Sequence, residues 1–137
     1  MDKTFFMIKP DAVAENNIGG IINIIEKSNF KIIALKMLLV ETKLATEHYK
    51  EHVNKPFFKD LVEFITSGPS VAMILEGQDC IQNLRDLVGN TNPTKAAKGT
   101  IRMKFGVDVG RNAVHASDSS EAAIREIDLF FNSSKIY

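Results

Sequence analysis

The sequence has little of the chemistry that marks secreted, metal-binding or membrane-spanning proteins. It contains no tryptophan and one cysteine, Cys80, so no disulfide can form within the chain, which is typical of a reducing compartment. Clusters of cysteine and histidine with the spacing of a zinc site are missing too. Cys80 falls on an apolar helical stripe with Leu84 and Leu87, so we expect a buried thiol rather than a reactive one.

Long apolar runs and an excess of one charge are also lacking. The apolar run at residues 4–8 is far too short for a signal peptide or a membrane span and ends at Pro10, so we expect a cytoplasmic protein. Lys and Arg number 17, as do Asp and Glu, and the formal net charge of zero weighs against general binding along nucleic acid. A small anion site needs only a few converging cations and is compatible with this balance.

What is present describes an ordinary folded domain. The 137 residues are 45% hydrophobic and 25% charged, without low-complexity tracts. This length suits one compact domain over residues 1–137 better than two.

Hydrophobic periodicity predicts strands at 4–8, 31–40, 71–75 and 113–115. Helices are expected from 18 to about 29, from a Thr42 cap to about 53, from Pro56 to about 65, from an Asp79 cap to 88, and after a capping box of Asp118 and Glu121. This order is β-α-β-β-α-β with inserted helices. We therefore expect an α+β, ferredoxin-like sandwich, with helices packed on a four-stranded, mainly antiparallel sheet.

Residues 89–110 show no clear periodicity, and we expect a long loop there, a feature that usually carries function in a compact domain. The phosphate-binding motifs G-x-x-x-x-G-K-[ST] and G-x-G-x-x-G are both missing, which argues against a P-loop kinase. The candidate cations are instead scattered over Lys9, Arg85, Arg102 and Arg111, each of which alone would usually be a solvated surface residue.

The histidines separate into two groups. His48 and His52 lie one helical turn apart, a spacing that could hold a metal, but no third ligand is evident nearby. A partly exposed helix face is therefore the favoured interpretation of both. His115 ends an apolar segment, where a structural role would be the first interpretation if the segment stood alone.

Six segments, taken in order and with their spacing, resemble the nucleoside diphosphate kinases. They are Ile-Lys-Pro-Asp at 8–11, Lys-Pro-Phe-Phe at 55–58, Ser-Gly-Pro at 67–69, Thr-Asn-Pro at 91–93, Gly-Thr-Ile-Arg at 99–102 and Asn-Ala-Val-His-Ala-Ser-Asp at 112–118. The resemblance runs from about Lys3 to Phe131, and its most specific element is Asn-x-x-His followed by Ser-Asp. The short C-terminus, ending at Tyr137, is similar to bacterial members.

This resemblance implies reversible, ping-pong transfer of a γ-phosphate, typically from ATP, to a nucleoside diphosphate through a pros-phosphohistidine at His115. The catalytic set that it implies is His115, Lys9, Asn112, Tyr49, Ser117 and Glu126. The nucleotide-binding set is Lys9, Phe57, Arg85, Thr91, Arg102, Val109 and Asn112. Mg²⁺ would arrive with the nucleotide and be held mainly by its phosphates, so we expect no dedicated metal site in the protein.

General chemistry is compatible with these roles. Histidine is largely neutral near pH 7, so a ring nitrogen is available as a nucleophile, and a covalent intermediate splits the reaction into two half-reactions. Stacking on Phe57 would tolerate any base. Each residue also has a simpler interpretation: Phe57 fits an apolar stripe with Leu61, Tyr49 could close the edge of the core, and Glu126 could lie on the surface.

Four positions depart from the family pattern. Ala116 stands where the family commonly has glycine, and it would add strain if the backbone there needs a positive φ. Met103 and Lys104 replace a pair that is often small and then acidic, while Ala12 in place of glycine is expected in bacterial members.

Two other functions compete with this one. A catalytically weak relative, acting as a nucleotide-binding or regulatory module, should have lost at least one of His115, Lys9 and Arg102, yet all three are present. Nucleic-acid binding as the main function would need a dense basic stripe, which the sequence lacks. The resemblance also implies a homo-oligomer, either tetramer or hexamer, and Pro93 lies in a loop that contacts neighbouring subunits in hexameric members.

Overall fold

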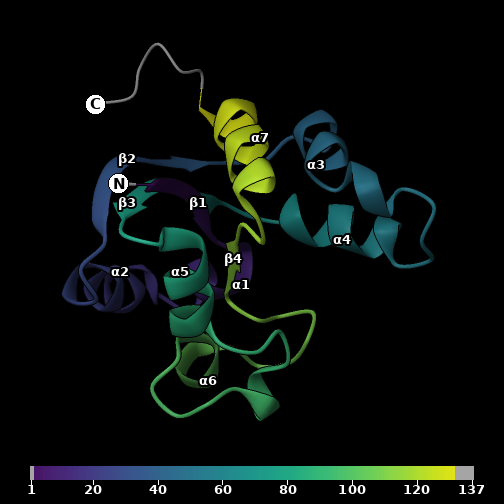
Figure 1. Cartoon of the computed structure of the whole chain (residues 1–137). Helices are drawn as coiled ribbons and strands as arrows, with labels where there is room; N and C mark the ends of the chain where they lie inside the picture. The colour runs from purple at the N-terminus through teal and green to yellow at the C-terminus, as the bar shows by residue number, and fades with distance from the viewer. Residues whose placement is uncertain (1, 132–137) are drawn as a thin grey trace.

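A computed structural model describes residues 2–131, in which four strands form one sheet. The strands are β1 (Asp2–Ile8), β2 (Lys31–Leu38), β3 (Ser70–Gly77) and β4 (Val114–Ala116). Their order is β2-β3-β1-β4, and each neighbouring pair is antiparallel. The α+β sandwich expected from the sequence is therefore confirmed (Figure 1). The C-terminal residues that prompted the comparison with bacterial members lie outside the described residues.

Helices cover this sheet and connect its strands. They are α1 (Pro10–Ala14), α2 (Ile18–Lys27), α3 (Thr42–His48), α4 (Phe58–Ile65), α5 (Cys80–Val88), α6 (Ile101–Phe105) and α7 (Ser120–Phe130), with 3-10 turns at Lys50–His52 and Pro93–Lys95. The sequence did not predict α1, which begins with Pro10 at a first-turn position that proline tolerates. No helix within residues 2–131 is long and apolar enough to cross a membrane.

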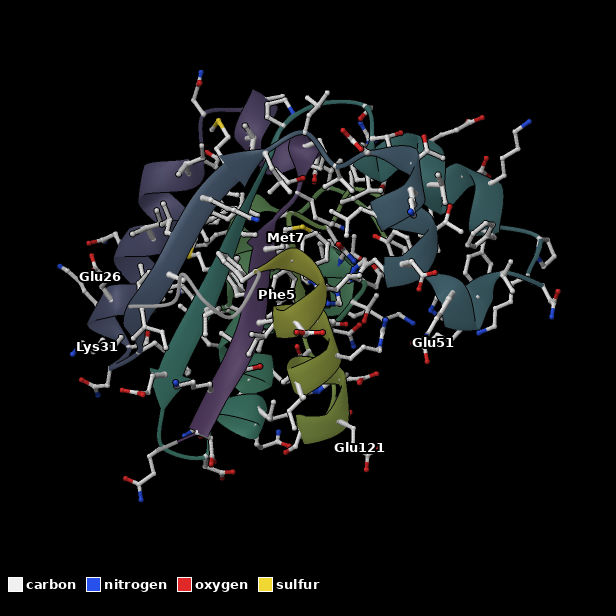
Figure 2. The ribbon with its side chains drawn as sticks, turned by 90° about the horizontal axis from the view of Figure 1, so that it is seen from above. Phe5, Met7, Glu26, Lys31, Glu51 and Glu121 are labelled. Atoms are coloured by element: carbon white, nitrogen blue, oxygen red, sulfur yellow. The ribbon has the colours of Figure 1, made fainter. Side chains whose placement is uncertain are left out.

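Strand β1 is buried on both faces of the sheet from Thr4 to Ile8. Phe5 and Met7 belong to the core cluster with residues of α3, α4 and α7, whereas Phe6 and Ile8 belong to the cluster with residues of α2, α5 and α6. Figure 2 shows Phe5 and Met7 beside α7. Since successive side chains point to opposite faces, a strand that is covered on both sides appears as one continuous apolar run.

Several predicted helix ends were wrong. Helix α7 is capped by Ser119, whose Oγ accepts a hydrogen bond from the Ala122 N–H at 3.0 Å, and not by the box of Asp118 and Glu121. The extended backbone of Ser119 aims its hydroxyl back into the first turn. Asp79 precedes α5 but its side chain makes no capping hydrogen bond.

The other corrections concern α3, α4 and the long loop. Helix α3 begins at Thr42 after an N-cap at Glu41 and ends at His48, not near residue 53. Helix α4 begins after Pro56, at Phe58. Residues 89–110 contain a 3-10 turn and α6, and elements of three and five residues are too short to show a helical period.

The topology brings distant segments together at one end of the sheet. In the pairing of β1 with β4, Ile8 lies opposite Val114 and Met7 lies opposite His115. Lys9, the residue after β1, donates its N–H to the carbonyl of Ala113 at 2.9 Å. Two of the six segments singled out in the sequence, 8–11 and 112–118, are therefore neighbours.

Candidate functional site

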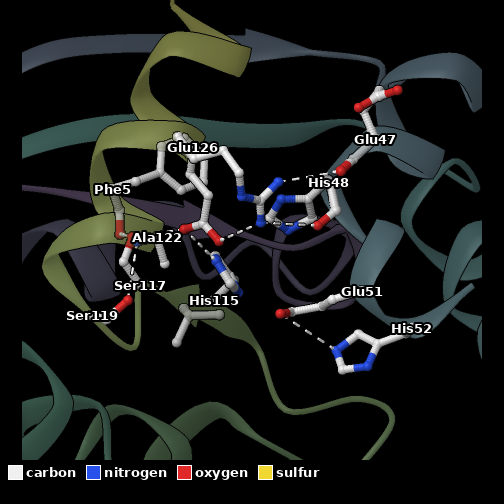
Figure 3. Close-up of polar contacts among 12 residues, drawn as sticks. Phe5, Glu47, His48, Glu51, His52, His115, Ser117, Ser119, Ala122 and Glu126 are labelled. Atoms are coloured by element: carbon white, nitrogen blue, oxygen red, sulfur yellow. Dashed lines mark hydrogen bonds and ion pairs between the residues drawn. The ribbon is translucent and has the colours of Figure 1, made fainter.

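His115 occupies the middle of β4 opposite Met7, so its side chain shares the face of the sheet that α3 and α7 cover. Directly opposite residues of an antiparallel pair project to the same face. His115 Nε2 lies 2.9 Å from Glu126 Oε1 on α7 (Figure 3). Because an ionised carboxylate can only accept, Nε2 carries the proton and Nδ1 keeps its lone pair. His115 thus presents a nucleophilic nitrogen.

Glu126 is buried rather than on the surface, with 5% of its side chain exposed. Ser117 Oγ donates a hydrogen bond of 2.6 Å to the same Oε1 that faces His115. Burial acts to raise the pKa of Glu126, but the hydrogen bonds from His115 and Ser117 and the nearby imidazole charge outweigh it, so this pKa is lowered. Glu126 therefore stays ionised and fixes the tautomer of His115.

Lys9 and Asn112 form a buried polar chain beside His115. Lys9 Nζ donates to Asn112 Oδ1 at 2.6 Å, and Asn112 Nδ2 donates to the carbonyl of Thr91 at 3.1 Å. Burial lowers the pKa of Lys9 to about 8; the charge of Asp11 raises it, and that of Arg102 lowers it further. Keeping Lys9 charged in this buried site is therefore costly unless an anion, such as a phosphate, lies beside it.

Arg102 has a structural role that the sequence did not suggest. Its guanidinium donates to three backbone carbonyls, those of Asn112 at 3.3 Å, Gly89 at 3.2 Å and Val114 at 2.9 Å. Burial, followed by the charge of Arg85, lowers the pKa of Arg102 to about 10. The side chain thus ties the loop to β4 while its remaining N–H groups stay available for an anion.

A cavity of about 790 Å³ opens in front of these residues. It brings together eight of the residues named from the sequence: Lys9, Tyr49, Phe57, Thr91, Arg102, Val109, Asn112 and His115. Phe57 and Val109 are 45% and 56% exposed, so Phe57 is not the core residue that its apolar stripe suggested. The cavity is thus polar around His115, with apolar side chains exposed on the same wall.

Three predicted residues lie outside this cavity. Arg85 lines an adjoining hollow of about 400 Å³, which shares Thr91, Arg102 and His115 with the larger one. Ser117 and Glu126 line neither, since both are buried behind the imidazole. The structure thus separates groups that could meet a ligand from groups that act through His115.

Tyr49 contributes a neutral phenol to the cavity wall. Burial, and then the charge of Glu126, raise its pKa to about 12. The hydroxyl is therefore protonated at physiological pH and available to donate a hydrogen bond.

His48 is the principal residue that the sequence interpretation missed. It is buried, with 3% exposed, and its ring meets that of His115 edge to face at a centroid distance of 4.7 Å. Burial, and then the charge of His115, lower its pKa to about 3, so it is neutral. The expected partly exposed face was wrong for His48, whereas His52 is half-buried, as expected, and lines the cavity.

Among the described residues, one group has the composition of a metal site. Ligand atoms of His48, His115 and Glu126 lie within 4.8 Å of one another. Two imidazole nitrogens and one oxygen suit a transition metal rather than Mg²⁺, which prefers oxygen ligands. Because His115 and Glu126 already bond each other, we assign no chemical step to a metal here.

None of the positions that depart from the family pattern has a positive φ. Ala116 lies in β4 opposite Phe6 and is not among the residues with positive φ, so the strain anticipated there is absent. The positive φ, of 73°, belongs to Ala113. Met103 and Lys104 are exposed on α6 and line neither cavity, and nothing in the structure explains their identities.

Comparisons with known proteins identify the family of the chain. The family model for nucleoside diphosphate kinase matches residues 2–136. The nucleoside diphosphate kinases of Desulforamulus reducens and Archaeoglobus fulgidus are 53% and 54% identical over 99% of this chain, which corresponds to 91% and 90% of theirs.

Solved structures give the same result. The Aquifex aeolicus nucleoside diphosphate kinase superposes with a TM-score of 0.96 at 42% identity, covering 99% of both chains. The Halobacterium salinarum enzyme, in complex with CDP, has a TM-score of 0.96 at 44% identity, covering 99% of this chain and 91% of that one. The chain belongs to the nucleoside diphosphate kinase family, a family of enzymes that bind nucleotides and transfer phosphate.

Proposed function

We propose that the chain catalyses reversible, ping-pong transfer of a γ-phosphate from a nucleoside triphosphate, typically ATP, to a nucleoside diphosphate through phosphorylated His115. One observation carries the proposal: His115 Nε2 is bonded to ionised Glu126 while the imidazole lines a cavity with Lys9 and Arg102. Nδ1 is then the nitrogen that receives the phosphate.

Each half-reaction balances without another reactant. The lone pair of His115 Nδ1 attacks the γ-phosphorus, the bond to the bridging oxygen breaks, and the electron pair leaves with the nucleoside diphosphate. The Nε2 proton stays in place beside Glu126, which stabilises the positive charge of the phosphorylated ring. A second diphosphate then attacks the phosphorus through its terminal oxygen and restores the free histidine.

Cationic groups around His115 would stabilise the charge of the transferring phosphoryl group. Lys9 and Arg102 line the same cavity as His115, and Arg85 lies in the adjoining hollow. Loss of one such contact costs on the order of 2–4 kcal/mol in comparable anion sites. Asn112 and Tyr49 line the same cavity and would add neutral donors toward the phosphate or the ribose 3′-hydroxyl.

Phe57 and Val109 provide a place for the base. Both are exposed apolar side chains that line the cavity containing His115. A base stacked between them would be held by its π-face, which all bases share. We therefore infer weak discrimination among purine and pyrimidine nucleotides, and the CDP complex of the Halobacterium salinarum relative is compatible with that.

The family generally uses a divalent cation, and we propose Mg²⁺ for this chain. Lys9 and Arg102 offer positive charge to the phosphates, while the nitrogen-rich group at His48 does not suit this ion. When bound, Mg²⁺ would be coordinated mainly by the phosphates and would neutralise part of their charge. The chain's own residues then position the phosphates and hold the Nε2 proton.

A homo-oligomer, tetramer or hexamer, and a cytoplasmic location complete the proposal. Strand β2 forms one edge of the sheet and exposes Leu35 and Met37 by 50% and 57%, a surface that a second copy would cover. Sedimentation of the purified protein is the test, and a monomer at micromolar concentration would refute the oligomer.

The function is tested by incubating the protein with Mg²⁺ and γ-labelled ATP, isolating it, and adding GDP or UDP. We expect acid-labile, alkali-stable label that passes to the diphosphate and is missing from His115→Asn. If ATP binds but no label is transferred, the kinase proposal fails and the chain is a nucleotide-binding module on the same fold.

A further inference from the structure

Ala113 adopts a conformation that a residue with a side chain rarely takes. Its φ of 73° lies in the left-handed region, where the Cβ atom crowds the backbone. The N–H of Val114 bonds the carbonyl of Asn112 at 2.9 Å, which closes a γ-turn around Ala113. This form of γ-turn is rare and strained, so something must hold it.

The residues that hold the turn come from the start of the chain. Asp11 Oδ2 accepts a hydrogen bond from the Ala113 N–H at 2.9 Å, and the Lys9 N–H donates to the Ala113 carbonyl at 2.9 Å. Both peptide groups that flank the Ala113 Cα are therefore fixed by one short segment. The backbone bond from Lys9 continues the β1–β4 ladder, whereas the bond from Asp11 is made by a side chain.

The turn lies between the two groups whose placement the reaction requires. Asn112, on one side, meets Lys9 Nζ at 2.6 Å, and His115 follows two residues after Ala113. Asp11 lines an adjoining hollow, which shares Phe64 and Arg111 with the His115 cavity, but Asp11 itself lines neither cavity beside His115. Asp11 can therefore affect the reaction only through its hydrogen bond to Ala113 or through its charge.

We propose that Asp11 is a positioning residue, whose carboxylate holds the γ-turn at Ala113 and thereby places His115 and Asn112 for phosphoryl transfer. The proposal rests on the proposed role of His115. Relaxation of the turn changes the direction in which both side chains leave the backbone. A displacement of about 1 Å at a reacting group can lower a rate on the order of 100-fold.

The test uses variants that separate the acceptor from the strain. Asp11→Ala removes the acceptor, Asp11→Asn keeps an amide oxygen that can accept, and Ala113→Gly lets the turn form without strain. The double variant, Asp11→Ala with Ala113→Gly, tests whether the turn can form without the carboxylate once glycine has removed the strain. The measurement is the single-turnover rate of His115 phosphorylation by γ-labelled ATP, at a temperature where thermal unfolding shows every variant folded.

We expect Asp11→Ala to label about 10- to 100-fold more slowly at unchanged nucleotide affinity. Asp11→Asn and Ala113→Gly should stay within a few-fold of the parent, and the double variant should regain most of the loss. A purely structural role for Asp11 would lower the melting temperature but leave the labelling rate of the folded protein unchanged.

Two outcomes would overturn the proposal. Labelling of Asp11→Ala at the parent rate would show that the turn needs no carboxylate. A double variant as slow as Asp11→Ala would show that Asp11 acts through its charge on Lys9 or Arg111. Hydrogen exchange at the Ala113 amide tests the turn independently of catalysis. It should be faster in Asp11→Ala than in the parent, and unchanged in Asp11→Asn. This measurement remains informative even if the parent protein takes no label and the proposed function fails.

Discussion

Glu126 Oε1 lies 2.9 Å from His115 Nε2 and at the same time accepts the Ser117 hydroxyl at 2.6 Å. One buried oxygen thus fixes both the tautomer and the orientation of the imidazole. The carboxylate comes from α7 and the imidazole from β4, so the relationship depends on how that helix packs over the sheet (Figure 3).

Replacement of Glu126 by Ala should slow phosphorylation of His115 on the order of 100-fold, because the proton can move to Nδ1 and the ring can turn. Glu126→Gln should lose less, since its amide oxygen can still accept from Nε2. Single-turnover labelling measures both. Glu121→Ala, an exposed change in the first turn of the same helix, is the matched control. Equal rates for all three variants would contradict the role of Glu126.

The lowered pKa of Lys9, about 8, predicts an alkaline limit on activity. Above that pH the free enzyme loses the ammonium charge, so kcat/KM for the nucleotide should fall with a limb near pH 8. Lys9→Arg keeps its charge and should lack this limb, even if its overall rate is lower. The pKa of Arg102 is lowered to about 10, so its charge persists through this limb. A limb near pH 8 that survives in Lys9→Arg would assign it to another group.

The lowered pKa of Lys9 also predicts how the free energy of unfolding depends on pH. Between pH 8 and 10.5 the unfolded chain keeps the Lys9 proton while the folded chain has released it, so the free energy of unfolding should rise with pH in this window. Urea unfolding at pH 7.5 and pH 9.5 measures the change. Lys9→Met should lack this contribution, whereas the exposed Lys59→Met should retain it. A steeper rise in Lys9→Met would reverse the sign and contradict the argument.

The strands and the polar segments could be predicted because their signals are local. The run at residues 4–8 is continuous since both faces of β1 are covered, and Pro10 marks its end. Phosphate-facing candidates such as Lys9 and Arg102 stood out through the motifs that they share with the family.

The rest depended on contacts between distant residues. The burial of His48 follows from its position under α7 and beside His115, 67 residues later in the sequence, and no helical period reports that. The sequence left open a positive φ at Ala116, where the family commonly has glycine, yet the positive φ lies at Ala113, whose N–H bonds a carboxylate 102 residues away. Three carbonyl bonds from Arg102 were equally invisible in the sequence.

The position of Ala116 leads to a prediction against the family pattern. Because Ala116 lies in β4 without a positive φ, Ala116→Gly relieves no strain and should lower stability by about 0.5–1 kcal/mol through the greater freedom of the unfolded chain. The labelling rate of His115 should not increase. Thermal unfolding and single-turnover labelling measure the two effects. A variant that is both faster and more stable would show that Ala116 is strained after all.

Phe57 offers a test of base stacking that is separate from folding. Its side chain is 45% exposed and precedes α4, so Phe57→Ala should change the melting temperature little. Loss of stacking should weaken nucleotide binding by about 1–3 kcal/mol, with a similar loss for purines and pyrimidines. Phe57→Tyr keeps the ring and serves as the control. If binding of only purines or only pyrimidines were weakened, Phe57 would contribute to base specificity rather than to general stacking. If KM stayed constant while kcat fell, the ring would act on phosphoryl transfer and the base would bind elsewhere.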